Sequence, residues 1–464
     1  MSPPNPFAAD ATPAAPSSVP PPPGSHDRSA GEAAAPGAAS GHDLPVDAIH
    51  ARLGALAVPV RGVEEVAIFA ALDRVLAEDV VSRMDVPPHD NSAMDGFAFD
   101  GAALAAGRPL RLQVAGTVLA GHRWPGTLGP GQCLRIMTGA VMPAGADTVV
   151  PQEAAVCHRS DDGTETVDIP PGAVRPGDHR RRAGEDLARG RTALARGSRL
   201  TPAALGLIAS LGQATVPVFR RLRVAFFSTG DEILSLGTPW REGAVYDSNR
   251  YTLFGLLARM GVEPIDLGAV PDEPQALEAA LRTAAGRADA IVTSGGVSAG
   301  AADHTRTLLD RLGSVEFWRV AMRPGRPMAA GRIPRPPSAN DSAADAVPAV
   351  LFALPGNPVA AMVAFLVFVR PVLWRMMGRR HTPAPALRAL AAEPLRKRPG
   401  RTEYQRGVVF QEADGTLRVR TTGPQGSGLL SSMVQADGLI VLPHASGPVA
   451  VGDPVEVLLF DGML

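Results

Sequence analysis

The chain has 464 residues, 45% of them hydrophobic, and a formal net charge of −1. That length and hydrophobic content allow several domains with sizeable cores. A charge so close to zero excludes an electrostatic case for nucleic acid as the main ligand. Neither cysteine, Cys133 or Cys157, lies in a Cys-x-x-Cys pair, so the sequence indicates no zinc or disulfide framework.

The first part of the chain changes composition at about residue 43. Residues 1–43 are rich in Ala, Pro, Ser and Gly, which predicts a disordered tail that cannot form a core. No basic stretch followed by an apolar run begins the chain, so we expect no signal peptide and a cytoplasmic protein. Beyond the tail, helical spacing of apolar residues predicts helices at Ile49–Leu56 and Val63–Leu76.

A β-prone block follows. Its runs are separated by Gly and Pro turns, as in a small β-rich domain over residues 98–182. Leu200–Gly212 then predicts a helix, with Thr201 as its cap and Gly212 at its exit. Helical sequence on both sides indicates that the β-rich block is inserted into a helical domain of residues 44–97 and 183–220. The expected strands of the insertion are Leu110–Ala115, Gln132–Ile136 and Thr148–Pro151.

Strand-like and helix-like segments alternate over residues 221–378, which implies parallel pairing through crossovers and a doubly wound α/β domain. Within it, the apolar stretch Val359–Val369 is too short to span a bilayer and predicts a buried helix. Pro334–Val347 is polar and proline-rich, as surface loops are. The expected strands are Arg223–Thr229, Val262–Leu267, Ala288–Thr293, Val315–Ala321 and Ala349–Leu354, and the helices are 247–260, Pro274–Ala285, Asp303–Leu312 and Pro358–Met377.

Short strand-like runs return over residues 379–464 and predict a small C-terminal β-domain, for which a barrel is one arrangement. These runs are Tyr404–Phe410, Leu417–Thr421, Gly438–Leu442 and Val455–Phe460.

A glycine-rich loop follows the strand Ala288–Thr293. Open α/β sheets bind ligands beyond the carboxyl ends of their strands, where this loop lies. Backbone without Cβ atoms can approach an anion closely, and its N–H groups can hold phosphate together with the helix start near Asp303. The alternative is a tight strand-to-helix turn, and glycine content favours neither. The loop residues concerned are Ser294, Gly295, Gly296 and Ser298.

Acidic residues follow three strands of the same sheet. Glu232, Asp272 and Asp303 would meet on one rim and repel one another unless a cation lies among them, which favours a hard ion such as Mg²⁺. The alternative, three solvated loop acids, carries equal weight from these residues alone.

Basic residues gather at the end of the fourth strand, with Arg319 inside it and Arg323 and Arg326 after it. Arg319, Arg323 and Arg326 could hold a phosphate or another oxyanion in a forked geometry. The alternative is a solvated basic edge. The turn after the last strand, Pro355-Gly356-Asn357-Pro358, lies at the same edge of the sheet.

Two further segments precede the α/β domain. Asp90-Asn91-Ser92-Ala93-Met94-Asp95-Gly96 contains strong turn signals, and composition alone favours an ordinary linker turn. Met137-Thr138-Gly139-Ala140 is a strand end followed by a turn.

Together these segments resemble the molybdopterin molybdenumtransferase family, which also includes the C-terminal part of gephyrin. Asp90–Gly96 is similar to the family's DNSAMDG signature, and the resemblance extends roughly from Pro45 to the C-terminus. The other matching blocks, in the same order, are Met137–Ala140, Arg182–Asp186, Ser228–Glu232, Tyr246–Arg250, Thr293–Asp303 and Leu354–Pro358.

The resemblance implies a four-domain chain in an elongated homodimer, with a cleft between the α/β domain of one chain and the β-rich insertion of the other. It implies that molybdate, as co-substrate, is inserted into adenylylated molybdopterin, and that AMP is released with help from Mg²⁺. Its catalytic positions match Asp90, Asp186, Glu232, Asp272 and Asp303, of which the last three are the metal ligands. The substrate-binding set is Thr138, Ser294, Gly295, Gly296, Ser298, Arg319, Arg323, Arg326, Pro355, Gly356, Asn357 and Pro358.

One departure from the family concerns the basic group. Relatives commonly carry lysines in a KPGKP-like stretch, whereas this chain has Arg319, Arg323 and Arg326, which keep the charge but not the geometry or the proton-donating ability of lysine. Two alternatives stay open: a molybdopterin adenylyltransferase, and a non-catalytic molybdopterin-binding or scaffold protein. Contact with the molybdopterin-adenylylating enzyme is expected, and neither nucleic acid nor membrane is.

Overall fold

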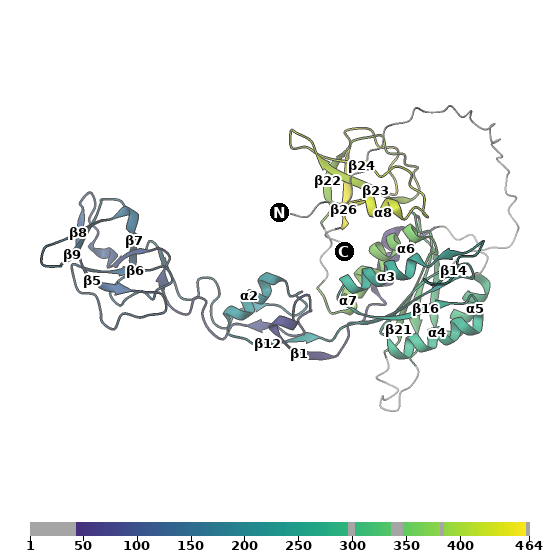
Figure 1. Cartoon of the computed structure of the whole chain (residues 1–464), viewed down its shortest axis with the longest axis horizontal. Helices are drawn as coiled ribbons and strands as arrows, with labels where there is room; N and C mark the ends of the chain where they lie inside the picture. The colour runs from purple at the N-terminus through teal and green to yellow at the C-terminus, as the bar shows by residue number, and fades with distance from the viewer. Residues whose placement is uncertain (1–42, 296–301, 336–346, 381–384, 461–464) are drawn as a thin grey trace, which may run out of the picture. The chain divides into compact units, whose positions relative to one another are not determined.

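The computed structural model of the chain describes residues 43–295, 302–335, 347–380 and 385–460, and of residues 302–306 it describes the backbone alone (Figure 1). The predicted tail of residues 1–42, Gly296, Ser298 and most of the Pro334–Val347 loop lie outside the described residues. The limits predicted for the domains stay predictions. The observed sheets are given below with their own bounds.

The region after the tail begins with helix α1 (Val46–Gly54), as predicted. The helix predicted over Val63–Leu76 is wrong, because β1 (Val63–Ala67) pairs antiparallel with β12 (Thr215–Phe219). Only a short 3-10 turn, Ile68–Ala70, follows β1. The apolar spacing fits both periods, and a partner strand about 150 residues away decides between them.

Helix α2 (Pro202–Ser210) confirms its predicted cap. The Thr201 hydroxyl accepts a hydrogen bond of 3.3 Å from the N–H of Ala204. Gly212 ends the helix with φ of +71°, a conformation that favours glycine. Two-stranded pairings complete this region: β2 (Val80–Val81) with β11 (Thr192–Leu194), and β3 (Asn91–Ser92) with β10 (Arg180–Arg181).

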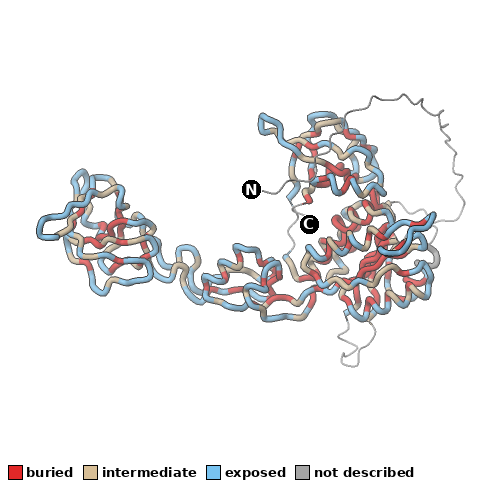
Figure 2. Tube along the Cα trace, viewed as in Figure 1, coloured by how far each residue is buried: buried red, intermediate tan, exposed pale blue. Residues whose placement is uncertain are grey.

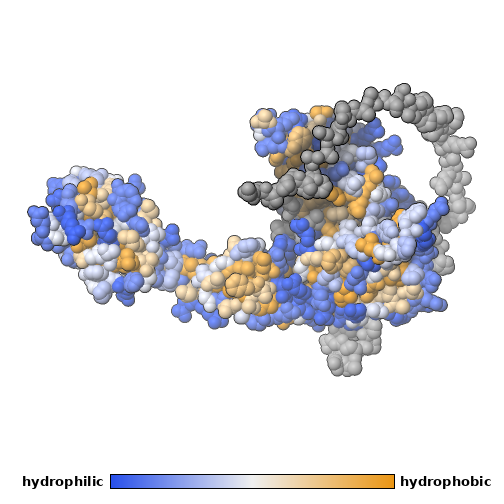
Figure 3. All heavy atoms as spheres, viewed as in Figure 1, coloured by the Kyte–Doolittle hydropathy of each residue, from blue (hydrophilic) through white to orange (hydrophobic). Residues whose placement is uncertain are grey.

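The β-rich block is one six-stranded sheet in the order β7-β4-β6-β5-β9-β8. Phe97, Phe99 and Leu134 are among its fully buried side chains. Figure 2 shows this block with buried segments in its middle and exposed segments around them, and hydrophilic side chains cover much of its face seen in Figure 3. The three predicted runs are all strands. The bounds are β4 Gly96–Phe99, β5 Leu110–Val118, β6 Gln132–Ile136, β7 Thr148–Pro151, β8 Val156–Arg159 and β9 Glu165–Ile169.

The α/β domain contains a six-stranded sheet in the order β16-β13-β17-β21-β20-β18. Four strands are parallel, as predicted. Strand β20, which was not predicted, runs antiparallel between β21 and β18. The bounds are β13 Arg223–Thr229, β16 Glu263–Val270, β17 Ala290–Ser294, β18 Ser314–Arg319, β20 Pro327–Ile333 and β21 Ala349–Leu354.

Helices cover both faces of this sheet, which confirms the doubly wound arrangement. Alternate residues of β13 point to opposite sides: Phe226 belongs to the core under α3 and α6, and Phe227 to the core under α4 and α5. The helix bounds are α3 Ser248–Arg259, α4 Pro274–Arg287, α5 Ala302–Leu312, α6 Pro358–Ala364 and α7 Arg370–Met376.

Helices α6 and α7 are joined without a break by a π-helical segment, Phe365–Val369. The resulting helix, Pro358–Met376, is long and apolar enough to cross a membrane by length and composition alone. However, 78% of its most apolar window is buried inside the fold, as in the core helix of a soluble protein. The predicted buried helix is therefore confirmed.

The C-terminal strands close into a five-stranded barrel, because β23 pairs with both β24 and β25. A short strand of the α/β domain, β19 (Met322–Arg323), adds to β23 in parallel. The segment that carries the predicted arginines is thus tied to the barrel by backbone pairing. The barrel strands are β22 Leu387–Ala391, β23 Thr402–Gln411, β24 Leu417–Thr421, β25 Gly438–Leu442 and β26 Pro454–Leu459.

Candidate active site

The glycine loop begins under tight steric control. Gly295 has φ of +98°, and a Cβ atom there would lie 2.1 Å from the carbonyl oxygen of Thr229. Its N–H donates to the carbonyl of Leu354 over 3.1 Å. Glycine at this position therefore allows the ends of β13, β17 and β21 to lie close together, as expected for a tight strand-to-helix turn. Gly296 and Ser298 lie outside the described residues, so phosphate binding by the rest of the loop stays a prediction.

A buried amide joins this loop to the turn after β21. Asn249, in the first turn of α3, donates from Nδ2 to Ser294 Oγ at 2.5 Å and to the carbonyl of Gly356 at 2.7 Å. Ser294 Oγ in turn donates to the carbonyl of Pro355 over 3.2 Å. The structure thus brings the predicted residues Ser294, Pro355 and Gly356 together, and it adds Asn249, which the sequence did not single out.

Two of the three predicted metal ligands, Glu232 and Asp272, interact electrostatically. Burial raises the pKa of Asp272, and repulsion from Asp231 and Glu232 raises that pKa further. The Asp272 N–H also contacts Asp231 Oδ1 at 3.4 Å. Asp303 lies in the first turn of α5, but its side chain is outside the described part. Among the described residues no group of three acidic, His or Cys side chains is arranged to hold a metal ion.

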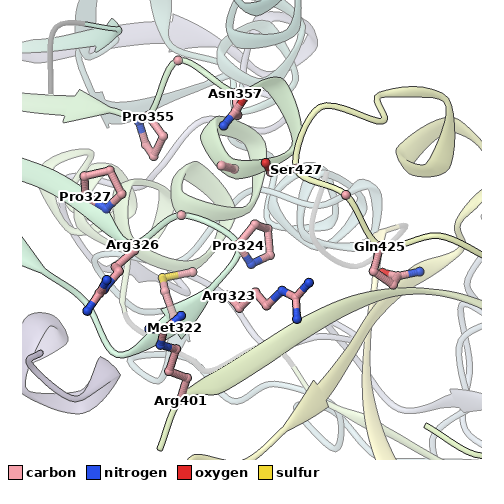
Figure 4. A pocket seen from close by; sticks show the side chains of 14 residues that line it. Met322, Arg323, Pro324, Arg326, Pro327, Pro355, Asn357, Arg401, Gln425 and Ser427 are labelled. Atoms are coloured by element: carbon pink, nitrogen blue, oxygen red, sulfur yellow. The ribbon is translucent and has the colours of Figure 1, made fainter. Parts of the chain in front are cut away.

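A cavity of about 510 Å³ lies beside the turn after β21 (Figure 4). Two predicted arginines, Arg323 and Arg326, line it together with Arg401 from the C-terminal domain. None of the described residues that line it is acidic. The remaining lining residues are Met322, Pro324, Gly325, Pro327, Pro355, Gly356, Asn357, Ala360, Gln425, Gly426 and Ser427.

The C-terminal domain is fixed to this cavity by two kinds of contact. The Ser427 carbonyl accepts a 3.0 Å hydrogen bond from the N–H of Val359, at the start of α6. The backbone of Arg323 in β19 lies opposite Glu403 of β23 in the parallel strand pairing. Sequence reasoning missed Arg401 and Ser427, because nothing local in the sequence marks them and only the β19–β23 pairing brings them here.

The arginines differ in how they are paired. Arg326 makes a forked ion pair with Asp43, with N–O distances of 2.8 and 2.9 Å, and Arg319 contacts the same carboxylate at 3.3 Å. Arg319 does not line the cavity. Within the described ranges, Arg323 and Arg401 make no ion pair. Their charges are therefore available to a bound anion.

A buried arginine adds to the positive charge. Arg406 of β23 is 1% exposed and donates to Ser432 Oγ and to the carbonyl of Gly426, each at 3.0 Å. Burial lowers the pKa of Arg406 to about 10, and the nearby charge of Arg323 contributes. An anion placed between these side chains would relieve their mutual repulsion.

The remaining predicted residues lie in the N-terminal region and do not line the cavity of the same chain. Thr138 donates to Asp95 Oδ1 from its N–H and from its hydroxyl, each over 2.7 Å, and these bonds lower the pKa of Asp95. Asp90 accepts from the N–H of Ala183 at 2.8 Å and pairs with Arg180 at 3.1 Å.

Asp186 is exposed. Its N–H donates to the carbonyl of Val86 over 3.1 Å, which fixes the backbone at this position. No hydrogen bond of its carboxylate is seen within residues 43–295 or the other described ranges. The side chain is therefore open to solvent in the single chain.

Comparison with known proteins decides the family. A molybdopterin molybdenumtransferase of Haemophilus influenzae is 39% identical over 399 residues, which cover 85% of this chain and 93% of that protein. The chain belongs to the molybdopterin molybdenumtransferase family. Molybdopterin molybdenumtransferase 2 of Mycobacterium tuberculosis is 38% identical over 395 residues, covering 82% of this chain and 91% of the relative.

Family profiles and solved structures agree with this membership. Residues 44–212 match the MoeA N-terminal region (domain I and II), residues 225–375 the "Probable molybdopterin binding domain", and residues 388–460 the MoeA C-terminal region (domain IV). A molybdopterin biosynthesis MoeA protein from Pyrococcus horikoshii superposes with a TM-score of 0.72 at 26% identity, covering 90% of this chain and 99% of that one. The fold expected from the family resemblance is thus confirmed.

Proposed function

We propose that this molybdenumtransferase-family chain inserts molybdate into adenylylated molybdopterin and releases AMP. The single observation that carries the proposal is the cavity lined by Arg323, Arg326 and Arg401, with no acidic side chain among the described residues that line it. Both substrates are anions, and forked guanidinium groups bind oxyanions with charge-assisted hydrogen bonds. The cavity therefore suits the part of the reaction where molybdate and the substrate phosphates meet.

The replacement of family lysines by arginines bears on the mechanism. Arginine keeps its proton at any working pH, so Arg323 and Arg326 can bind and orient an anion but cannot act as general acids. The protein's own contribution at this edge is then charge and position. Proton transfer, where it is needed, falls to other groups or to water.

The donor chemistry at the acidic rim fits Mg²⁺. Glu232 and Asp272 offer oxygen ligands. The pKa of Asp272 is raised first by burial and further by repulsion from Asp231 and Glu232, and a cation would relieve that repulsion. Mg²⁺ is usually held by one or two carboxylates together with substrate phosphates. When bound, the ion would neutralise phosphate charge as AMP leaves, with Glu232 and Asp272, and Asp303 as the family resemblance implies, as its ligands.

We propose that the active unit is a homodimer with a shared cleft. Asp90, Thr138 and Asp186 belong to the N-terminal region and none lines the arginine cavity of its own chain. Asp90 and Thr138 lie on backbone fixed by hydrogen bonds, as reacting or orienting groups require. A second subunit would bring them to the cavity, as the family resemblance implies.

The reaction itself is the direct test. Purified protein is incubated with adenylylated molybdopterin, molybdate and Mg²⁺, and both AMP and active cofactor are measured. We expect both products, and neither when molybdate is left out. An adenylyltransferase would instead consume ATP and molybdopterin and form pyrophosphate. Binding of the adenylylated pterin with no AMP and no active cofactor would overturn the proposal and support a scaffold protein.

A further inference from the structure

One acidic side chain controls the segment that carries the cavity arginines. Asp43 Oδ2 accepts from Arg326 Nε at 2.8 Å, Oδ1 accepts from Arg326 Nη2 at 2.9 Å, and Oδ1 also lies 3.3 Å from Arg319 Nε. The Asp43 side chain is 16% exposed, so water competes little for it. One carboxylate therefore holds both ends of the segment Arg319–Arg326.

The backbone beside Asp43 is held on the same segment. The N–H of Leu44 donates to the carbonyl of Arg319, and the carbonyl of Leu44 accepts from the N–H of Ala321, each over 2.8 Å. The segment closes on itself through a 2.8 Å bond from the N–H of Val320 to the carbonyl of Arg326. The carboxylate and these three backbone bonds leave the segment one position, with Arg323 at its centre, in β19.

Pairing with Asp43 does not remove Arg326 from anion binding. A guanidinium carries five N–H donors, and this side-on pair uses one from Nε and one from Nη2. The other three donors, two of them on Nη1, have no partner in the described part of the chain. Arg326 lines the cavity while it is paired, so it can hold Asp43 and an anion at the same time.

We propose that Asp43 is a positioning residue for the anion cavity, an inference that rests on the proposed function. It fixes the segment Arg319–Arg326 and so places Arg323 and Arg326 for the oxyanion. If charge alone decided the affinity, removal of a negative charge beside an anion site should tighten anion binding. Positioning predicts the reverse: binding weakens when Asp43 is lost.

The test uses the full chain and molybdate as the probe, with the dissociation constant measured by calorimetry. We expect Asp43→Asn to weaken binding by about tenfold, since one forked, charge-assisted contact is lost from the support of the site. Asp43→Glu, which keeps the charge but shifts the carboxylate by one methylene, should also weaken it. Asp47→Asn is the matched control, because Asp47 is an exposed acid of the neighbouring helix α1. The affinity of this variant for molybdate should stay within about twofold of the parent.

A second readout separates positioning from general damage to the fold. In the reaction assay, Asp43→Asn should raise KM for molybdate while the melting temperature and the affinity for adenylylated molybdopterin change little. Equal or tighter molybdate binding by Asp43→Asn would overturn the inference, and so would equal weakening by Asp47→Asn.

Arg323→Ala, measured in the same titration, separates the role of the cavity from the role of Asp43. If Arg323→Ala binds molybdate as the parent does, the cavity is not the molybdate site, and the main observation behind the proposed function no longer supports it. Should Arg323→Ala weaken binding while Asp43→Asn does not, the cavity stands and the role of Asp43 is overturned.

Discussion

Asn249 donates a 2.5 Å hydrogen bond to Ser294 Oγ, and through it the first turn of α3 is joined to the carboxyl end of β17. The same Nδ2 reaches the carbonyl of Gly356, after β21. Asn249 is 8% exposed, and its Oδ1 has no partner among the described residues. One side chain thus connects three elements at the carboxyl edge of the sheet.

Replacement of Asn249 by Ala should lower the free energy of unfolding by about 1–3 kcal/mol, because buried partners lose their donor. Asn249→Asp should be at least as damaging, since a carboxylate would face the carbonyl of Gly356 without a proton to donate. Chemical denaturation of both variants measures the effect. Parent-like stability of the two would show that the connection contributes nothing to the fold.

The acidic rim gives a prediction on pH and metal. The folded pKa of Asp272 is raised, so this group contributes stability at low pH that is lost as pH rises through its folded pKa. At neutral pH the ionised carboxylate is repelled by Asp231 and Glu232, and Mg²⁺ should relieve that repulsion. We therefore expect Mg²⁺ to raise the melting temperature of the parent at pH 7, and much less that of Asp272→Asn.

Asp161→Asn is the control for this experiment, because Asp161 is an exposed acid of the β-rich domain, away from the rim in sequence. It should keep the full response to Mg²⁺. An identical response by Asp272→Asn and the parent would remove Asp272 from the metal ligands.

Local sequence predicted the α/β elements well, since several strands there are compact apolar runs and helices begin at a capping side chain or at a proline. Strand β13 and the capped helix α3 are examples. Strand β20 was missed because Pro327–Ile333 follows the arginine turn and contains Gly331, which lowers β propensity. The Val63–Leu76 helix failed because β1 is decided by a distant partner, β12.

The site was predictable only in part, for the same reason. Arg323, Arg326 and the turn Pro355–Pro358 follow strands of one sheet, so topology alone brings them to one edge. Asp43 and Arg401 reach the same place through the Leu44–Val320 bridge and the β19–β23 pairing. Pairings between segments far apart in the sequence leave no local sequence signal.

Thr138 should control the pKa of Asp95. Its N–H and hydroxyl bonds lower the pKa of Asp95, so loss of the hydroxyl should move that pKa back toward its ordinary value. Thr138→Val should therefore raise the Asp95 pKa, as measured by NMR titration of the carboxyl carbon, and Thr138→Ser should not. Equal titration of Asp95 in both variants would mean that the backbone N–H alone sets its pKa.

The shared cleft predicts complementation between subunits. Asp90→Asn keeps an acceptor for the N–H of Ala183 and should fold, yet it should turn over slowly, as should Asp303→Ala. Mixed dimers of the two variants should recover part of the activity, because one cleft in each would contain both native residues. The control is a mixture of each variant with itself. No recovery after proven subunit exchange would place both residues in a cleft of one chain.

The arginine cavity should receive the substrate anion, and the kcat/KM of Arg323→Ala is the direct test of this role. Loss of one charge-assisted contact should cost about 1.5–3 kcal/mol, a fall in kcat/KM of roughly 10- to 150-fold, with Arg323→Lys in between. Arg420→Ala, which removes an exposed arginine of β24, is the matched control and should keep the parent value. A parent-like kcat/KM for Arg323→Ala, or an equal fall for Arg420→Ala, would contradict a specific role of the cavity in binding the substrate anion.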